Sequence, residues 1–342
     1  MLQNKFLKSL KRGVHPSISI NYGKRLVKAF PQFPEFRKFV LDDRDIYQSF
    51  YSELEPYSDF SFNNLLVWLD INSDLEVSRL NGNLIFKFSD PFENNETSFT
   101  LIGNRKTYQT LGTIFQYQAG LGYQQKLSMV PQAVIDGIEL GKQRHLDIQE
   151  DISNQDYIFN VNNAYYAKGK DFADLRHRIN SFLKKYGDHL IYRDINLGKL
   201  EEQMNIINSL HTWDSVYALT ENDKLRIEGL AIDRYLQLAP ELDSRCVGLF
   251  INGRLQSFSL FHLPPQKGFA IGNHMKCNYE YQYIFDFTFY CTASRLKTMG
   301  IEWLNGEQDL GIAGLRTHKK ELRPTYFLKR YTVQPLKQPS GH

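Results

Sequence analysis

The 342-residue sequence has few cysteines and no long apolar run. Its three cysteines, Cys246, Cys277 and Cys291, form no C-x-x-C pair, which argues for a reducing compartment and against a disulfide framework. No stretch reaches the ~18–20 apolar residues of a membrane-spanning helix, and the mean hydropathy is −0.44. The N-terminus also lacks the continuous apolar core of a signal peptide. These absences predict a cytoplasmic protein without a transmembrane segment.

Most standard chemical motifs are missing as well. The stretch 137–142 resembles a phosphate loop but is one residue short, and 120–122 lacks the third glycine of a dinucleotide fingerprint. The nine histidines show no metal-binding spacing, so no metal is expected. Neither half has the glycine-rich loop with which an acyltransferase of the GNAT fold binds acyl-CoA. Cys277 is either a nucleophile or a buried structural thiol, and the pattern favours the thiol.

Charge is distributed unevenly along the chain. The formal net charge is +3, but residues 1–34 carry +7, residues 315–342 carry +6, and the span between them carries −10. Two basic ends suit a polyanion such as RNA or an anionic lipid surface, or they simply aid solubility. From Leu2 to Lys11 the pattern fits a short basic amphipathic helix at a membrane, a transit peptide or a frayed terminus.

Two hairpin signals lie half a chain apart. Asn-Gly between alternating apolar residues occurs at Asn81-Gly82 and again at Asn252-Gly253. After each, the pattern predicts a strand, a helix ending near glycine, and a second strand. These are expected at 98–102, 108–119 and 126–130, and again at 269–275, 283–298 and 301–304. The repeated order predicts two similar α/β halves with mixed sheets, and it matches the core order of the GNAT fold.

Two further helices are predicted. Apolar residues recur at helical spacing over 172–182, with Asp171 as the expected N-cap and Gly187 at the end. A second helix is expected over about 310–323, with Asp309 as a plausible N-cap. The sequence thus divides into a basic segment over 1–34, an N-terminal GNAT-like domain over 35–195 and a C-terminal GNAT-like domain over 196–342.

Three sets of residues carry a resemblance to a known family. The first runs from Lys168-Gly169-Lys170 to Tyr186-Gly187, the second from Asn305-Gly306-Glu307 through Arg316 and Lys319 to Pro324, and the third comprises Tyr57-Ser58-Asp59-Phe60 and Phe62-Asn63-Asn64-Leu65. Together they resemble the catalytic C-terminal region of phosphatidylglycerol lysyltransferases, a group also called DUF2156. The resemblance implies a tandem GNAT fold and transfer of an aminoacyl group from aminoacyl-tRNA to a lipid headgroup.

The sequence departs from the family pattern in two places. Residues 176–180 read Arg-His-Arg-Ile-Asn where members often have Lys-Arg-Asn, and Glu321-Leu322 replaces the usual Ser-Tyr before Pro324. The transmembrane region of the full-length lipid synthases has no counterpart in these 342 residues. We therefore expect this chain to have the fold of the family. The acceptor is expected to be a lipid headgroup or another hydroxyl or amine.

Aminoacyl transfer needs a group that handles a proton, donors for an oxyanion, and positive charge for phosphates. The expected catalytic pair is Glu307 and Asp309, although Asp309 also suits a helix cap. The expected substrate-binding residues are Tyr57, Asp59, Lys168, Lys170, Arg176, Arg178, Asn180, Lys276, Arg316 and Lys319. Each has a plainer alternative: a solvated lysine or arginine, an ordered turn for Tyr57 and Asp59, and an ion pair for one of the two arginines at 176 and 178.

Three hypotheses for function remain open at this point. The first is an aminoacyltransferase that uses aminoacyl-tRNA as donor, needs no other cofactor, and acts in the cytoplasm or at a membrane surface. The second is a CoA-dependent N-acyltransferase with acyl-CoA as donor. The third is a non-catalytic protein that binds RNA or anionic phospholipid. The sequence identifies neither the amino acid, the acceptor nor the oligomeric state.

Overall fold

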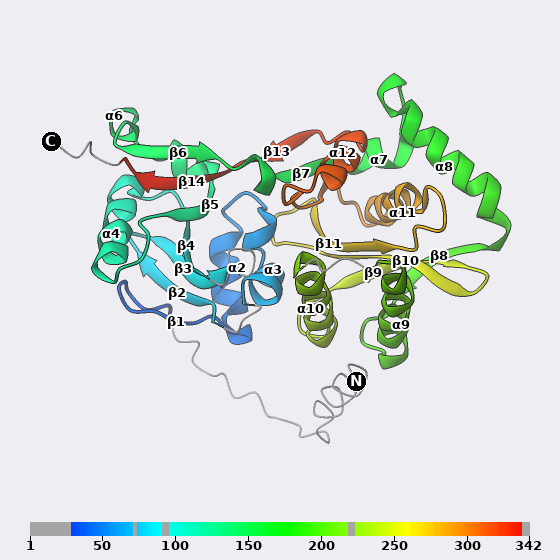
Figure 1. Cartoon of the computed structure of the whole chain (residues 1–342), viewed down its shortest axis with the longest axis horizontal. Coiled ribbons are helices and arrows are strands. Elements are labelled where there is room, and N and C mark those ends of the chain that lie inside the picture. Colours follow the sequence, from blue (N-terminus) through cyan, green and yellow to red (C-terminus); the bar gives the residue numbers. More distant parts are fainter. Residues whose placement is uncertain (1–28, 71–73, 91–95, 218–222, 337–342) are drawn as a thin grey trace, which may run out of the picture.

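The computed structural model describes residues 29–70, 74–90, 96–217 and 223–336 (Figure 1). These residues form a mixed α/β protein with three sheets flanked by helices. Most of the predicted basic segment 1–34, including its amphipathic beginning, lies outside the described residues, as do residues 337–342.

The first part of the chain builds a four-stranded antiparallel sheet and the strands beside it. In chain order its elements are β1 (Arg37–Lys38), α2 (Arg44–Tyr51), α3 (Phe62–Asn64), the π-helical segment η3 (Leu65–Leu69), β2 (Glu76–Leu80), β3 (Asn83–Asp90), β4 (Glu96–Ile102), α4 (Thr107–Gly120), β5 (Leu127–Pro131), α5 (Gln132–Asp136), α6 (Leu140–Gln143) and β6 (Leu146–Glu150). The order β1-β2-β3-β4 follows the chain: a two-residue turn joins β2 to β3, and β3 pairs antiparallel with β4.

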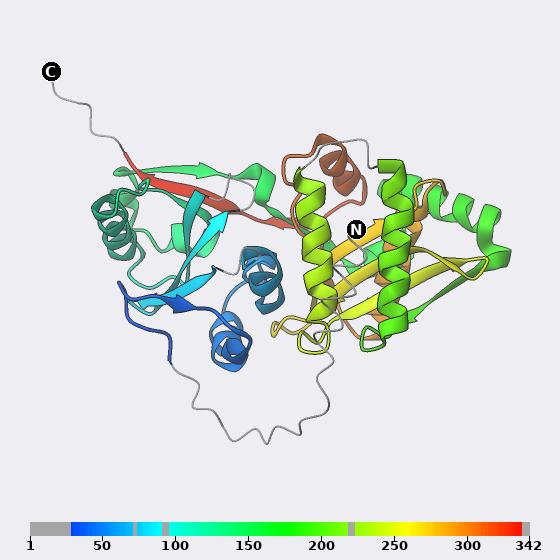
Figure 2. The same cartoon turned by 60° about the horizontal axis from the view of Figure 1, so that its bottom comes forward.

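The second part builds a seven-stranded mixed sheet. Its elements are β7 (Asp156–Asn160), α7 (Val161–Tyr166), α8 (Ala173–Tyr186), β8 (Leu190–Ile195), α9 (Leu200–Tyr217), α10 (Asp223–Gln237), β9 (Arg245–Ile251), β10 (Arg254–His262), β11 (Phe269–Cys277), α11 (Ile284–Thr298), β12 (Trp303–Asn305), α12 (Ala313–Glu321), β13 (Tyr326–Leu328) and β14 (Arg330–Pro335). Helices α9 and α10 cover one face of this sheet and α11 the other (Figures 1 and 2).

Both predicted hairpins are confirmed, and their turns show why the signal is strong. Asn81 and Gly82 have φ of 55° and 84°, and Asn252 and Gly253 have φ of 51° and 75°. Two consecutive left-handed residues give the turn whose twist matches that of the flanking strands, and Asn-Gly adopts it at low cost. The strand–helix–strand set predicted after each hairpin is also present, as β4-α4-β5 and β11-α11-β12.

The two halves share strands across the predicted boundary at residue 195. The sheet order β13-β7-β12-β11-β10-β9-β8 places β7 between two strands from the C-terminal end of the chain. In return, β14 lies between β5 and β6 and pairs antiparallel with both. Strands therefore cross the predicted boundary at residue 195 in both directions, and β8 also belongs to the second sheet.

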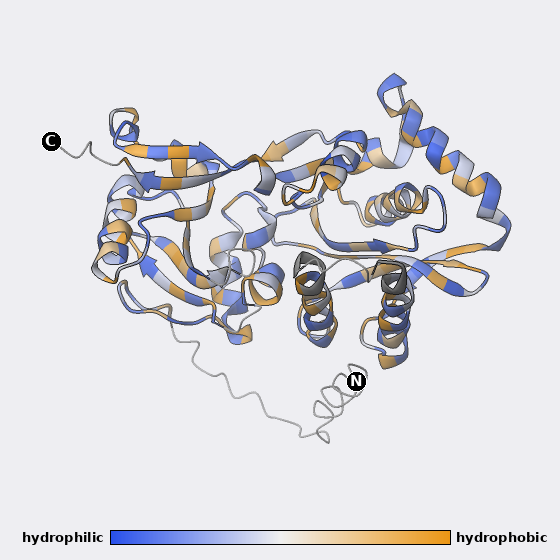
Figure 3. Ribbon diagram, in the orientation of Figure 1, coloured by the Kyte–Doolittle hydropathy of each residue, from blue (hydrophilic) through white to orange (hydrophobic). Residues whose placement is uncertain are grey.

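Helix α8 has the apolar face that the sequence predicts. The rest of its surface is largely hydrophilic (Figure 3). Leu175, Ile179 and Phe182 are buried, and Gly187 is the C-cap as expected. The N-cap, however, is Phe172 and not Asp171, because residues 170–172 form a 3-10 turn before the helix.

Helix α12 is shorter than predicted, and its N-cap is Ile312 instead of Asp309. Leu310 and Gly311 have left-handed φ of 52° and 72°, which interrupts the helix before it can extend to residue 310.

Candidate active site

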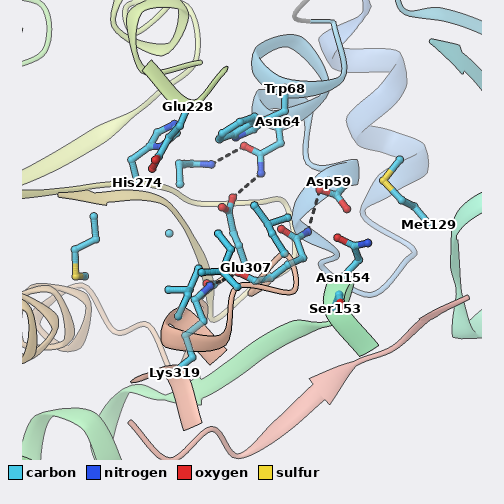
Figure 4. A pocket seen from close by; sticks show the side chains of 18 of the residues that line it. Asp59, Asn64, Trp68, Met129, Ser153, Asn154, Glu228, His274, Glu307 and Lys319 are labelled. Carbon is cyan, nitrogen blue, oxygen red and sulfur yellow. Dashed lines mark hydrogen bonds and ion pairs between the residues drawn. The ribbon is translucent and has the colours of Figure 1, made fainter. Parts of the chain in front are cut away.

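A cavity of about 460 Å³ lies between the two halves. Its walls come from η3, β5 and the segment 151–154 on one side, and from β11, α11, α12 and the loop between β12 and α12 on the other. Figure 4 shows Glu307 between Lys319 below and His274 and Glu228 above it. Because both halves contribute walls, the cavity exists only in the assembled fold.

The cavity lies where β11 and β12 part. These strands pair in parallel only from Phe269 to Ile271, after which β11 continues alone on that side to Cys277. The pairing of β11 with β10 shifts register between Leu260 and Phe261, so Asn273 is an extra, bulged residue. A bulge redirects side chains, and bulges are common beside active sites. Here it brings the adjacent Asn273 and His274 into the lining of the same cavity.

Glu307 follows β12 and enters the cavity from a strained backbone. Its φ is 57°, an uncommon value for a residue with a Cβ. The Glu307 amide donates to Asn305 Oδ1 at 2.8 Å, and Asn64 Nδ2 donates to Glu307 Oε1 at 2.7 Å. Burial raises the pKa of the Glu307 carboxyl to about 8, and the contacts with Asn64 and Lys319 offset this only partly. A carboxyl with this pKa can exchange protons at neutral pH.

Lys319 from α12 secures the loop that carries Glu307. Its ammonium donates to the carbonyl oxygens of Gly306 at 2.7 Å and Gln308 at 2.5 Å, on both sides of Glu307. Burial lowers the pKa of Lys319 to about 8, while the negative charge of Glu307 acts to raise it. With two of its three donors on backbone carbonyls, Lys319 stabilises the left-handed loop and supplies positive charge beside the carboxyl.

Two asparagines connect Glu307 to the bulge. Asn273 Nδ2 donates to Asn64 Oδ1 at 2.6 Å, and Asn64 in turn donates to Glu307. Asn273 Oδ1 accepts from Tyr235 at 2.7 Å and lies 2.8 Å from His262 Nδ1. This buried chain fixes the rotamers of Asn64 and Asn273, and amide donors held in place are suited to binding developing negative charge.

His274 and Glu228 form a second polar group on the cavity wall. His274 Nδ1 lies 3.9 Å from Glu228 Oε1, and Lys276 Nζ lies 2.5 Å from Glu228 Oε2. Burial alone would raise the pKa of Glu228, but His274 and Lys276 together hold it at about 2. Burial lowers the pKa of His274. Glu228 is therefore ionised and His274 neutral at neutral pH.

Of the predicted site residues, Asp59, Glu307 and Lys319 line the cavity, and Asp309 and Arg316 do not. Asp309 is fully buried and accepts two hydrogen bonds from Arg316, at 2.8 and 2.9 Å, and one from Tyr157 at 2.6 Å. Burial would raise the pKa of Asp309, but these bonds lower it. Asp309 and Arg316 thus neutralise one another outside the cavity lining, with Asp309 buried and the Arg316 guanidinium partly exposed.

Asp59 and Tyr57 differ in position although they are neighbours in the sequence. Asp59 Oδ1 accepts from Gln308 Nε2 at 2.9 Å at the edge of the cavity. Tyr57 is buried outside the lining, and its hydroxyl donates to Lys329 O at 2.9 Å. Burial raises the pKa of Tyr57 to about 12, so its hydroxyl stays protonated.

The five predicted residues from 168 to 180 lie outside the cavity lining. Arg176 donates to the carbonyl oxygens of Ala167 and Gly169, and Arg178 pairs with Asp286 of α11 at 2.9 Å. The ion-pair alternative therefore holds for Arg178. Lys168, Lys170 and Asn180 are exposed. Lys276, the remaining predicted residue, forms the ion pair with Glu228 that is described above.

The sequence did not single out Glu228, Asn273 or His274 for a role in the site. Asn64 lies in the quoted Phe62–Leu65 motif, and the bulge that turns Asn273 and His274 into the cavity has no local sequence signature. The three cysteines are all buried and free. Burial raises the pKa of Cys277 to about 12, so its thiol stays protonated at neutral pH. This agrees with the expectation that Cys277 is a buried structural thiol and not a nucleophile.

Within the described ranges, no three His, Cys, Asp or Glu side chains gather as a metal site requires. Across the same residues, none of the helices has the length and apolar character needed to cross a membrane.

The two α/β halves meet around one cavity that Glu307 lines, and the family match that follows identifies a transferase of acyl groups. The sequence profile of the phosphatidylglycerol lysyltransferase C-terminal family matches residues 52–334, and the chain belongs to this family. The resemblance noted in the sequence is thereby confirmed. No curated protein matches the chain.

Three solved structures are similar in fold. A conserved protein of unknown function from Bacteroides thetaiotaomicron VPI-5482 has 22% identity and a TM-score of 0.77, over 88% of this chain and 99% of that chain. The DUF2156 C-terminal domain of an Agrobacterium fabrum protein has 13% identity and a TM-score of 0.58, over 86% and 91% of the two chains. L-PGS from Bacillus licheniformis has 13% identity and a TM-score of 0.56, over 92% and 96%.

Proposed function

We propose that this protein transfers an aminoacyl group from an aminoacyl-tRNA to a hydroxyl or amine acceptor, with a lipid headgroup as the first candidate. The observation that carries the proposal is the position of Glu307 in a single cavity whose walls come from both halves. A donor and an acceptor that are both bulky need access from two directions, and a cavity between two halves suits such a pair.

The residues around Glu307 match the requirements of acyl transfer. The acceptor attacks the ester carbonyl of the charged tRNA, and a proton must move from the acceptor to the leaving ribose oxygen. Glu307, with a pKa of about 8, exchanges this proton. The amide donors of Asn64 and Asn273 and the charge of Lys319 lie in the same lining and stabilise the oxyanion.

Positive charge for the tRNA is available outside the cavity. Lys168 and Lys170 are exposed in the turn before α8, and Lys184 and Lys185 are exposed in its last turn. Lysines of this kind bind phosphates without reading sequence. Arg316, which the sequence also suggested for phosphate binding, is already occupied by Asp309.

The second half of the chain supports the CoA-dependent alternative less well than transfer from aminoacyl-tRNA. The loop before α11 contains no glycine, and Asp286 in the first turn of that helix is already paired with Arg178 at 2.9 Å. A CoA-binding half would present a glycine-rich loop whose backbone N–H groups bind the pyrophosphate at the helix N-terminus, and this loop lacks that composition.

The test is a transfer assay with the purified full chain. Total tRNA charged with radiolabelled amino acids is incubated with phosphatidylglycerol vesicles, and label is measured in the lipid phase. We expect label transfer that acetyl-CoA neither supports nor inhibits. Tight CoA binding by calorimetry, without transfer from tRNA, would favour the CoA-dependent alternative. Binding of tRNA or vesicles without any transfer, unchanged in Glu307→Ala, would favour a non-catalytic protein.

A further inference from the structure

We propose that the cavity binds the side chain of the aminoacyl donor against an apolar wall, so that the preferred donor carries an aliphatic or aromatic amino acid larger than alanine. This inference rests on the proposed function and names the class of its donor. The wall comes from β7, β11, α11, β12 and the end of α12, all in the second half.

One wall of the cavity is part of the hydrophobic core of the second half. Six lining residues belong to that core or pack against it: Phe159 of β7, Met275 of β11, Phe285 and Phe289 of α11, Leu304 of β12, and Leu322. Phe159 and Phe289 meet edge to face with ring centroids 5.2 Å apart. Protein cores are closely packed, and space beside such a wall offers water few hydrogen-bonding partners. An apolar group of a ligand is the occupant that this wall suits.

Two glycines shape this wall. Gly272 of β11 lines the cavity, and a Cβ there would meet Leu304 Cδ1 and Asn305 O at 3.6 Å, an ordinary contact distance. A larger side chain at position 272 would therefore take up space beside Leu304. At Gly306 a Cβ would lie 2.7 Å from Phe159 Cε2, so the glycine lets the Phe159 ring lie directly beside the loop that carries Glu307.

The apolar wall has no counter-charge for an ionised side chain. Within the described residues, the lining from β7, α11, β12 and α12 contains no carboxylate, and the Lys319 ammonium already donates to the carbonyl oxygens of Gly306 and Gln308. The hydroxyl of Thr292, which also lines the cavity, donates to Thr288 O at 2.9 Å within α11. Burial of a charge without a partner is costly. The wall therefore disfavours lysyl, arginyl and acidic aminoacyl groups.

The opposite side of the cavity is polar and suits the acceptor. Figure 4 shows Asp59, Ser153 and Asn154 together on one side of Glu307. Their carboxylate, hydroxyl and amide groups can bind the hydroxyls of a headgroup. Leu304 precedes Glu307 by only three residues, so a side chain on the carbon next to the reacting carbonyl is close to the apolar wall. The acyl chains of a lipid acceptor lie beyond its headgroup, and the hydrophobic effect keeps them in the bilayer.

The first experiment measures kcat/KM in the lipid transfer assay with tRNA that carries one radiolabelled amino acid at a time. We expect leucyl-tRNA and phenylalanyl-tRNA to exceed lysyl-tRNA by at least about 100-fold, because the charged side chain has no partner in the wall. A lysyl, arginyl or glutamyl donor that reacts as fast as leucyl-tRNA would overturn the inference and leave the proposed function intact. If no charged tRNA donates label, the proposed function fails and the inference fails with it.

The second experiment narrows the apolar end with Gly272→Val. We expect the ratio of kcat/KM for leucyl-tRNA to that for alanyl-tRNA to fall by roughly 10–100-fold, because the valine occupies the space of the leucyl side chain. The KM for phosphatidylglycerol should not change. Gly112→Val, at an exposed glycine of α4 outside the cavity, is the matched control. An unchanged ratio, or a KM raised for long-chain but not for short-chain phosphatidylglycerol, would contradict the inference, the latter by assigning the wall to a lipid chain.

The third experiment adds a charge to the wall at Met275, which is only partly buried. Met275→Glu should raise the ratio of lysyl to leucyl transfer by at least about tenfold, because the new carboxylate supplies the missing counter-charge. Met275→Gln, of the same size but neutral, is the matched control and should not favour lysyl transfer. Both ratios are measured on one protein preparation, so a partial loss of folded enzyme cancels. Equal lysyl-to-leucyl ratios in the two variants would show that this wall does not contact the aminoacyl side chain.

Discussion

Glu307 illustrates at the residue scale how a strained, buried carboxyl is maintained for function. Its left-handed backbone and its burial are both unfavourable, and the contacts from Asn64, Asn305 and Lys319 compensate for them. Strain of this kind persists where the surrounding structure holds the residue in place, and it concentrates at functional sites.

We predict that Glu307→Gln abolishes transfer but stabilises the fold above pH 4.5. The unfolded carboxyl releases its proton near its ordinary pKa of 4.5, whereas the folded one keeps it until about pH 8. The unfolded wild type thus binds fewer protons in this window, and wild-type stability falls as the pH rises. The melting temperature of the variant, measured by calorimetry, should exceed that of wild type increasingly from pH 5 to pH 8. Glu302→Gln, at an exposed position, should show no such trend.

Lys319 gives the second prediction at this scale. Lys319→Met removes the hydrogen bonds to Gly306 and Gln308, so the loop moves and Glu307 is misplaced. We expect kcat to fall by about 10–100-fold with little change in KM, since small displacements of a catalytic group are costly. The neighbouring Lys320 is exposed, and Lys320→Met is the matched control. A higher KM with unchanged kcat would instead support phosphate binding by Lys319.

At the scale of secondary-structure elements, α8 and the turn before it present exposed lysines away from the cavity. We predict that Lys168→Glu with Lys170→Glu weakens tRNA binding and reduces the slope of log affinity against log salt by about 1–2. Filter binding over a range of salt concentrations measures both effects. Lys142→Glu with Arg144→Glu, at and next to α6 and at the opposite end of the molecule in Figure 1, is the control. Equal losses in both double variants would contradict a specific surface near α8.

Most of what the sequence predicted correctly concerns secondary-structure elements. The Asn-Gly turns, the apolar stripe of α8 and the repeated strand–helix–strand order depend on residues close together in the chain, and all are present. The predicted N-cap at Asp309 was wrong, because the left-handed Leu310 and Gly311 make α12 begin later, and Asp309 pairs with Arg316 instead.

At the scale of the whole molecule, the exchange of β7 and β14 joins the two halves. Arg330 of β14 is fully buried and pairs with Asp156 of β7 at 2.9 Å and with Asp59 at 3.1 Å. Asp156 also accepts from Ser58 and from Asn305, the residue at the end of β12. One buried ionic network thus connects the strands that the halves exchange with the loop that carries Glu307.

We predict that Arg330→Leu destabilises the protein by about 3–5 kcal/mol, because it leaves buried carboxylates without a counter-charge. Urea unfolding followed by fluorescence measures this change. Lys329→Met, at the exposed adjacent position whose lysine pairs with Glu150 at 3.0 Å, should leave the free energy of unfolding nearly unchanged, because exposed ion pairs contribute little. Equal effects of the two substitutions would show that the buried network does not hold the halves together.

The sequence by itself determined the family, the duplicated α/β architecture and most element positions, because turns, helix stripes and motifs are set by residues near one another in the chain. Only the tertiary structure decided which strands the halves exchange, that Lys319 points inward to the Glu307 loop, and that His274 meets Glu228 on the cavity wall. These contacts join residues from different elements, and a bulge in β11 redirects two of the side chains. Their geometry depends on packing between elements, which no local pattern specifies.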